Sequence, residues 1–433
     1  MIFIGIFLIC FTGILFMTIS RKKNNFFSPI IFFNLWTIIS TVPRIIQISN
    51  LYSTNQWLQY FIYTTLYMIS VNLGIIAISK RVTLNKTIYS NLNQKKYGIL
   101  LFIVGSLSRI ILVVNSGGFI KVISSTGVRT QILAGLGYLN LLTILIVYGI
   151  TLYYISYLTD LKRKNAKKAD LVILIIMIFS GSFLLIVFGN RSPLLEMVIA
   201  LLIALNFHSK TLKIKDFFKP QALLLAMFIV LFMFMMPLLR NRDNSNLFLD
   251  PAQWVRMAIE NPTKGIFQEI STVDRDIFTF EYFERETKWY GKVYLNIFYQ
   301  PIPSTIFPNK PPMDDGMYLY NIMRGQSVSP NTPTNQLEYQ TSIPFSTAGI
   351  AYANFGLIGI ILGGFLIGLI HSISYRRLIK SNFSAGFIII YQIVLFRLEL
   401  STLHILSSLI PIVLIYILDT RIVKYSMFKK RVS

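Results

Sequence analysis

Residues 2–23 read IFIGIFLICFTGILFMTISRKK, an uninterrupted apolar run that ends in three basic residues. A helix needs about 20 predominantly apolar residues to cross the hydrocarbon core of a bilayer. Similar apolar runs, separated by short polar links, recur along the chain. Continuous apolar runs favour helices over strands, because a helix in lipid satisfies its own backbone hydrogen bonds. The repeated pattern therefore predicts an all-α polytopic membrane protein.

The composition supports the membrane class and excludes several others. Of the 433 residues, 54% are hydrophobic and 14% are charged, which is too few charges to cover a soluble surface. The net charge of +23 comes from short basic clusters between apolar runs, so we expect no nucleic-acid partner. Cys10 is the single cysteine and the three histidines are far apart in sequence. We therefore expect no disulfide within the chain, no metal site and no cofactor.

The apolar runs predict about eleven transmembrane helices in two groups. Residues 1–239 hold helices one to eight, residues 240–355 form one large loop, and residues 356–433 hold helices nine to eleven with a basic tail. The runs are Ile2–Ser20, Pro29–Ile48, Trp57–Ser79, Tyr97–Val114, Tyr138–Leu158, Leu171–Phe188, Pro193–Phe207, Gln221–Leu239, Gly356–Ser374, Ala385–Leu395 and Leu403–Leu418.

Basic residues alternate between the links and so predict the orientation. One set of links is rich in lysine and arginine, from Arg21–Lys23 through to the C-terminal tail, whereas the alternate short links hold few. Basic links stay in the cytoplasm. We expect an N-terminus outside, a retained first span rather than a cleaved signal, a cytoplasmic C-terminus and the large loop on the outer side.

The large loop has the composition of a folded segment. Asp250-Pro251 suits a helix start, and the residues that follow show an apolar stripe at helical spacing. A second amphipathic stretch covers Ile277–Phe283, whereas Pro301–Pro312 holds too many prolines for a regular helix. The aromatic content argues against a disordered connector. We predict a small helical cap on the membrane surface.

A charged tip is predicted between the sixth and seventh runs. The link is Gly189-Asn190-Arg191-Ser192-Pro193, which places Arg191 at the outer lipid interface beside a helix N-terminus. An arginine beside free helical N–H groups is an anion site, and diphosphate is an anion common in lipid-carrier chemistry. The alternatives are an ion pair with Glu196 and an interaction with lipid headgroups.

Further charges interrupt the apolar sequence near the outer ends of other runs. Arg397 and His404 would share a helix face if their segment stayed helical, and Glu399 lies between them. The alternative for this segment is a local Arg397–Glu399 pair. Arg240 and Arg242 follow the eighth run and suit either phosphate binding or headgroup anchoring.

A general base for an acceptor hydroxyl could come from several outer-side groups. Spacing alone selects none of them, and a solvated surface position is the alternative for each loop carboxylate. The candidates are Asp274, Asp276, Glu281, Glu338, Glu399 and His404.

At these residues the chain resembles the bacterial O-antigen and capsule repeat-unit polymerases of the Wzy type. The resemblance rests on the Gly189-Asn190-Arg191 tip and on two proline motifs, Pro301-Ile302-Pro303 and Phe307-Pro308-Asn309-Lys310-Pro311. It also rests on residues 349–359, which read GIAYANFGLIG and contain Asn354, and on Arg397 near the outer end of the tenth run. With the hydropathy layout it covers most of the chain.

The resemblance implies a metal-independent membrane glycosyltransferase of the GT-C type in the bacterial inner membrane. It would move a growing glycan from undecaprenyl diphosphate onto a new lipid-linked repeat unit, with a chain-length regulator and a flippase as possible partners. The resemblance maps the family's outer arginines onto Arg191, and also onto Arg240, Arg242 and Arg397, as diphosphate ligands. Lys310 and Asn354 are carried over as motif members, and Lys310 joins the diphosphate-binding set.

Two other functions stay open at this point. Related ligases, which attach finished glycan to lipid A, use an outer-side histidine in the large loop, whereas His404 lies in the last link. A polysaccharide flippase is the alternative from another class, although transporters commonly show internal repeats and midplane charges that this sequence does not show clearly.

Overall fold

The computed structural model describes residues 1–19, 25–78, 92–124, 137–188, 192–209, 211–212, 216, 219, 271–300, 302 and 306–432. These residues form helices and connecting loops, with no β-strand in the described part of the chain. Eight of the described helices are long and apolar enough to cross a membrane. Large apolar side chains also point outward, including Phe3 on the first helix and Phe179 on a later one. Outward apolar surface on long helices is what contact with lipid requires, so the chain is a polytopic membrane protein.

The eight candidate spans follow eight of the eleven predicted runs, and two shorter apolar helices follow the last two. The eighth predicted run, Gln221–Leu239, lies outside the described residues. The last two helices have apolar parts of only Ala385–Phe396 and Thr402–Ile417, shorter than the other eight spans. The eight are α1 (Ile2–Ile19), α2 (Pro29–Gln47), α3 (Thr54–Ala77), α4 (Leu92–Asn115), α8 (Leu145–Lys162) with α7 (Gly137–Leu142), α9 (Lys168–Ile186), α10 (Ser192–Ala204) with the π-turn η2 (Leu205–Ser209), and α17 (Thr347–Lys380).

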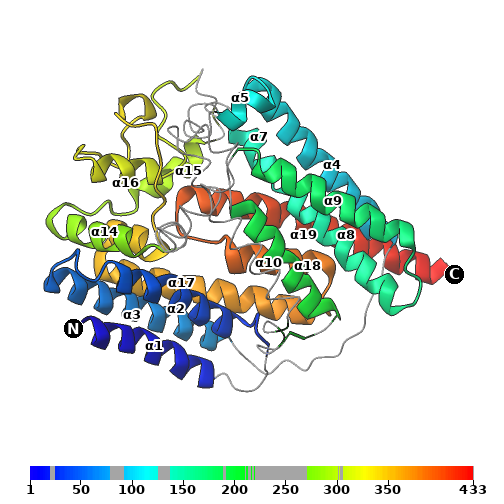
Figure 1. The fold of residues 1–433 in the computed structure, drawn as a ribbon, viewed down its shortest axis with the longest axis horizontal. Helices are drawn as coiled ribbons and strands as arrows, with labels where there is room; N and C mark the ends of the chain where they lie inside the picture. The colour runs from blue at the N-terminus through cyan, green and yellow to red at the C-terminus, as the bar shows by residue number, and fades with distance from the viewer. Residues whose placement is uncertain are drawn as a thin grey trace, which may run out of the picture.

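One group of spans contains α1, α2, α3 and α17, which lie side by side in Figure 1. Glycines bring α3 and α17 together: a Cβ on Gly74 would lie 2.2 Å from the carbonyl oxygen of Phe365, and one on Gly368 would lie 2.0 Å from that of Val71. Small residues at such positions let two helices in a membrane pack closely.

The second group contains α4, α8, α9 and α10, with α18 (Ala385–Phe396) and α19 (Thr402–Val432) against it. Gly98 and Gly149 let α4 and α8 approach closely, because a Cβ on either would meet the backbone of the other helix. The short helix α5 (Phe119–Ser124) follows α4. Helix α8 is buried along most of its length and forms the centre of this group.

The described residues between 271 and 346 form a cap layer over one end of the first group (Figure 1). Its elements are α14 (Val273–Arg285), the 3₁₀ turn η5 (Lys292–Leu295), α15 (Asn296–Tyr299), α16 (Gly316–Met323) and the 3₁₀ turn η6 (Thr334–Gln336). Helix α14 buries Ile277, Phe280 and Phe283, which confirms the amphipathic stretch predicted there. The described residues between 306 and 312 form no helix, as their prolines predict. The apolar stripe predicted after Asp250-Pro251 lies outside the described residues.

An ion pair ties the cap layer to α2. Arg44 donates from Nε and Nη2 to the two carboxylate oxygens of Asp274, at 2.7 and 2.9 Å. A bidentate pair of this kind holds geometry as well as charge. Arg44 therefore fixes the base of α14 on the end of a membrane span instead of reaching for lipid.

Arg109 is also enclosed by protein. It is 1% exposed and donates to the carbonyl oxygens of Leu184 and Leu185, with its guanidinium 4.3 Å from the ring centre of Phe188. Carbonyl groups in the last turn of a helix lack intrahelical donors. Arg109 thus fixes the end of α9 against α4.

The two ends of the bundle differ in character. Figure 1 shows the N-terminus on the side of the cap layer and the C-terminus at the opposite end. At that opposite end Lys95 bridges Asp160 and Asp170, at 2.7 and 2.6 Å, and so joins α4, α8 and α9. An odd number of spans, such as the eleven predicted, would place the two termini on opposite sides of the membrane.

Candidate functional site

The candidate site lies where α18 stops and α19 begins, at residues 397–404. Helix α18 ends at Phe396 and α19 starts at Thr402, so the segment is not one continuous helix. Ser401 caps α19: its Oγ accepts the N–H of His404 at 3.3 Å. The premise that Arg397 and His404 share a helix face is therefore wrong. The interruption directs the charged side chains of the link toward different partners.

Arg397 pairs with Glu196 on α10. Its Nε lies 2.7 Å from Glu196 Oε2, and the side chains are 22% and 3% exposed. Tyr148 on α8 lies beside the pair, and its buried hydroxyl has no hydrogen-bond partner among the described residues. The two terminal amino groups of Arg397 make no hydrogen bond within the described part of the chain. The guanidinium is thus held from one side and can donate from the other.

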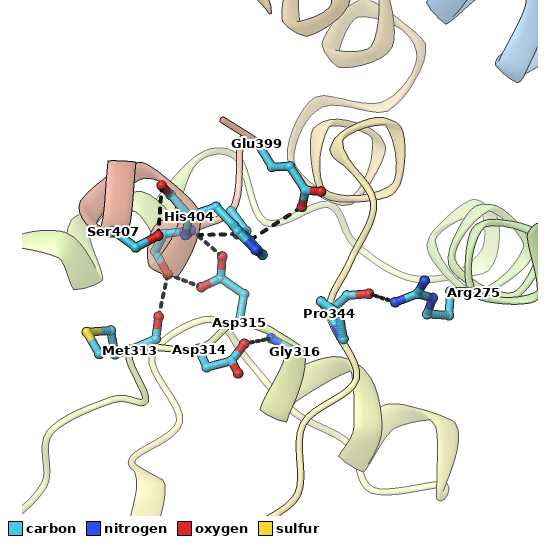
Figure 2. A network of polar contacts seen from close by, with 11 residues as sticks. Arg275, Met313, Asp314, Asp315, Gly316, Pro344, Glu399, His404 and Ser407 are labelled. Carbon is cyan, nitrogen blue, oxygen red and sulfur yellow. Dashed lines mark hydrogen bonds and ion pairs between the residues drawn. The ribbon is translucent and has the colours of Figure 1, made fainter. Parts of the chain in front are cut away.

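Glu399 and His404 form the second feature of the link (Figure 2). His404 Nδ1 lies 3.4 Å from Glu399 Oε2 and 2.6 Å from Ser401 Oγ. The side chains of Glu399 and His404 are 39% and 29% exposed, so a reactant can reach them. With Nδ1 facing a carboxylate, Nε2 is the nitrogen left to take a proton. The local Arg397–Glu399 pair considered from sequence is not present, because each residue has another partner.

Asp315 completes the site from the cap layer, and sequence reasoning missed it. Both of its oxygens accept from Thr402, one from the backbone N–H at 2.7 Å and one from the hydroxyl (Figure 2). The Thr402 hydroxyl also lies 2.8 Å from the carbonyl oxygen of Met313. Asp315 is fully buried, and burial raises its pKa to about 7. A carboxylate 87 residues away in sequence gives no local signal of this contact.

The other loop carboxylates among the base candidates have structural partners or lie on the surface. Asp274 binds Arg44, and Asp276 accepts the hydroxyls of Thr272 and Ser346 at the start of α17. Burial raises the pKa of Asp276 to about 6. Glu281 binds Arg285 at 2.7 Å and accepts from Gln56 at 2.5 Å, whereas Glu338 is exposed. Of the six candidates, Glu399 and His404 face each other.

Two motif residues of the resemblance hold the backbone. Lys310 donates from Nζ to the carbonyl oxygens of Gln300 and Ile302, both at 2.9 Å, and so closes the proline-rich loop. Burial lowers the pKa of Lys310. Both contacts hold the backbone of the cap layer, and diphosphate binding by Lys310 stays a prediction.

Asn354 supports a break within α17. Gly356 has φ +60° and ψ −144°, a conformation that glycine adopts readily, and it separates the helix into two segments. Asn354 Oδ1 accepts the N–H of Gly291 at 3.0 Å, and the carbonyl oxygens of Ala353 and Asn354 accept from the same loop. The motif thus joins the cap layer to the ninth predicted span.

The remaining predicted site residues lie outside the described residues. They are Gly189, Asn190, Arg191, Arg240 and Arg242. Comparisons with protein-family models, curated proteins and solved structures find no match to this chain.

Proposed function

We propose that this protein is a membrane glycosyltransferase that polymerises oligosaccharide repeat units carried on undecaprenyl diphosphate. The observation that carries the proposal is the link between α18 and α19. Arg397, with a side chain 22% exposed, and the more exposed Glu399–His404 pair lie there at one end of a bundle of apolar helices. In a lipid-linked sugar the polyprenyl chain lies in the hydrocarbon core, and the diphosphate and the sugars lie at the end of the spans, where the membrane meets water. One end of the bundle therefore offers both an anion-binding group and a base.

His404 is the group best suited to activate the acceptor. The facing Glu399 favours the tautomer that carries a proton on Nδ1 and stabilises the imidazolium formed when Nε2 takes another. Well-placed general bases contribute about 10²–10⁴-fold to rate. Glu399 acts through His404 and needs no contact with the sugar.

Arg397 is suited to the leaving group. Its Nε is held by Glu196, which fixes the plane of the guanidinium, and its terminal amino groups remain available to phosphate oxygens. The unpaired hydroxyl of Tyr148 lies nearby as a further donor. Electrostatic stabilisation of developing charge is usually the largest catalytic contribution. Arg191, Arg240 and Arg242 remain predicted diphosphate ligands.

The proposed reaction is a displacement at an anomeric carbon. The acceptor hydroxyl gives its proton to His404, its oxygen forms a bond to the anomeric carbon of the growing glycan, and the bond from that carbon to the phosphate oxygen breaks. The electron pair of the broken bond leaves with undecaprenyl diphosphate, whose charge Arg397 balances. The reaction needs no oxidant and no metal.

The orientation belongs to the proposal. We place the cap layer and the N-terminus on the outer face of a bacterial inner membrane and the basic C-terminal end in the cytoplasm. The cap layer would then enclose the sugars while the spans hold the polyprenyl chains. A GT-C-like arrangement of eleven spans, a chain-length regulator and a flippase remain part of the same proposal.

The test uses purified protein in vesicles with defined undecaprenyl-diphosphate-linked repeat units, resolved on a gel. We expect a ladder from the wild type and its loss, by at least 10²-fold in rate, for Arg397→Gln and His404→Gln. Arg44→Gln is the matched control, because Arg44 is also paired with a carboxylate at the same end but lies outside the site.

The same reaction separates the proposed polymerase from the two alternatives. A product formed only when lipid A is added would identify a ligase. Movement of lipid-linked glycan across the vesicle without lengthening would identify a transporter. Either result would replace the proposed polymerase.

A further inference from the structure

A buried carboxylate of the cap layer lies at the N-terminus of the last span. Asp315 is fully buried, and its two oxygens accept the backbone N–H and the hydroxyl of Thr402. Thr402 itself is fully buried. The N-terminus of a helix carries partial positive charge and unpaired N–H groups, so a carboxylate is favoured there. The Thr402 hydroxyl also lies 2.8 Å from the carbonyl oxygen of Met313, so Thr402 joins the start of α19 to the cap layer at Asp315 and at Met313.

The first turn of α19 carries the proposed base. Ser401 precedes Thr402 as the helix cap, and His404 follows two residues later, with Nδ1 2.6 Å from Ser401 Oγ. The orientation of the imidazole therefore depends on the position of this turn. Asp315 holds Thr402 from both its backbone and its side chain, which fixes the turn in translation and in rotation.

We propose that Asp315 is a positioning residue for acceptor activation, which acts through Thr402 to hold His404 against Glu399. The inference rests on the proposed function, because it gives His404 the role of base. It adds a role for the cap layer, which would set the geometry of the reacting groups as well as enclose substrate. A small displacement of a reacting group is sufficient to slow a reaction strongly, by about 10²-fold for 1 Å.

Three variants test the contact. Asp315→Asn keeps the shape but replaces one acceptor oxygen with a donor, Thr402→Val removes the hydroxyl and keeps the size, and Thr402→Ser keeps the hydroxyl. We expect the first two to lower kcat by about 10-fold or more with KM for the acceptor little changed. Thr402→Ser should keep kcat near the wild-type value, because it keeps the hydroxyl that Asp315 accepts.

Asp276→Asn is the matched control. Asp276 is also a buried cap-layer carboxylate, and it accepts the hydroxyl of Ser346 at the start of α17. Its partners carry none of the proposed reacting groups. We expect a loss of stability similar to that of Asp315→Asn and a kcat within about two-fold of the wild type.

Hydrogen exchange provides a readout that does not depend on activity. The amides of residues 402–405 should exchange faster in Asp315→Asn and in Thr402→Val than in the wild type or in Asp276→Asn. Wild-type kcat in the Asp315→Asn and Thr402→Val variants, with His404→Gln inactive, would overturn the positioning role and leave the proposed function intact. An equal fall in kcat for Asp276→Asn would also overturn it, since the effect would then be general destabilisation. A wild type that makes no ladder would reject the proposed function and the role of Asp315 in acceptor activation, while exchange would still report on the contact itself.

Discussion

The Arg397–Glu196 pair allows a quantitative test of how the site is held. Replacing Glu196 by Gln removes a carboxylate that is 3% exposed and leaves the guanidinium without its counter-charge. Replacing Arg397 by Gln leaves the carboxylate unpaired instead. The double variant removes both charges, so the two single variants and the double variant form a thermodynamic cycle.

The expected magnitudes follow from the burial of the pair. At an effective dielectric constant of about 20, two unit charges about 4 Å apart attract by about 4 kcal/mol. Removing one member of a buried pair costs about 3–5 kcal/mol, because the other charge stays uncompensated. Arg397 retains 22% exposure, so we expect about 3 kcal/mol for each single variant. The double variant should cost much less than the sum, giving a coupling of about 2–3 kcal/mol.

The assay is equilibrium unfolding in mixed detergent micelles, followed by the loss of helical signal. Unfolding midpoints are compared at constant protein concentration and constant ionic strength. If the losses in the two single variants simply added in the double variant, the pair would contribute no specific free energy. The claim that Glu196 fixes the guanidinium would then fail.

Three further predictions concern the cap layer and its junction with the spans. The folded-state pKa values of Asp315 and Asp276, about 7 and about 6, lie above their ordinary values, so the folded state holds more protons than the unfolded state in this range. The unfolding midpoint should therefore fall as pH rises through 6 to 7. Asp315→Asn removes one of the two titrating carboxyl groups and should make the unfolding midpoint depend less on pH. Gly356→Ala should lower stability by about 1–3 kcal/mol, because φ +60° with ψ −144° strains any residue with a Cβ; an unchanged unfolding midpoint would count against the break in α17. Asn354→Ala should cost about 1–3 kcal/mol by leaving the N–H of Gly291 without its acceptor, and an Asn354→Asp variant, which keeps an oxygen there, should lose less.

Much of the fold could be predicted from local sequence. Apolar runs locate the spans, because each helix in lipid must satisfy its own backbone hydrogen bonds. Glycines spaced four apart on the ninth predicted run are typical of close helix packing, whereas the partner helix α3 is known only from the structure. The amphipathic period of residues 277–283 predicts α14. These features depend on neighbours within a few residues, which is the information that a single sequence carries.

The pairing of charges could not be predicted in the same way. Glu196 and Arg397 lie 201 residues apart, and Asp315 and Thr402 lie 87 apart, so no spacing rule connects them. The sequence offered Arg191 as the partner of Glu196 and Glu399 as the partner of Arg397. In the structure Arg397 pairs with Glu196, and His404 faces Glu399. The helix break at residues 397–401 points these side chains toward different partners.

The most direct measurement is the amount of undecaprenyl diphosphate released for each new glycosidic bond by the purified wild type. The proposed displacement predicts a ratio of about one, with both products lost together in His404→Gln and Arg397→Gln. Glycan lengthening without release of undecaprenyl diphosphate, or transport of lipid-linked glycan with neither product, would contradict it.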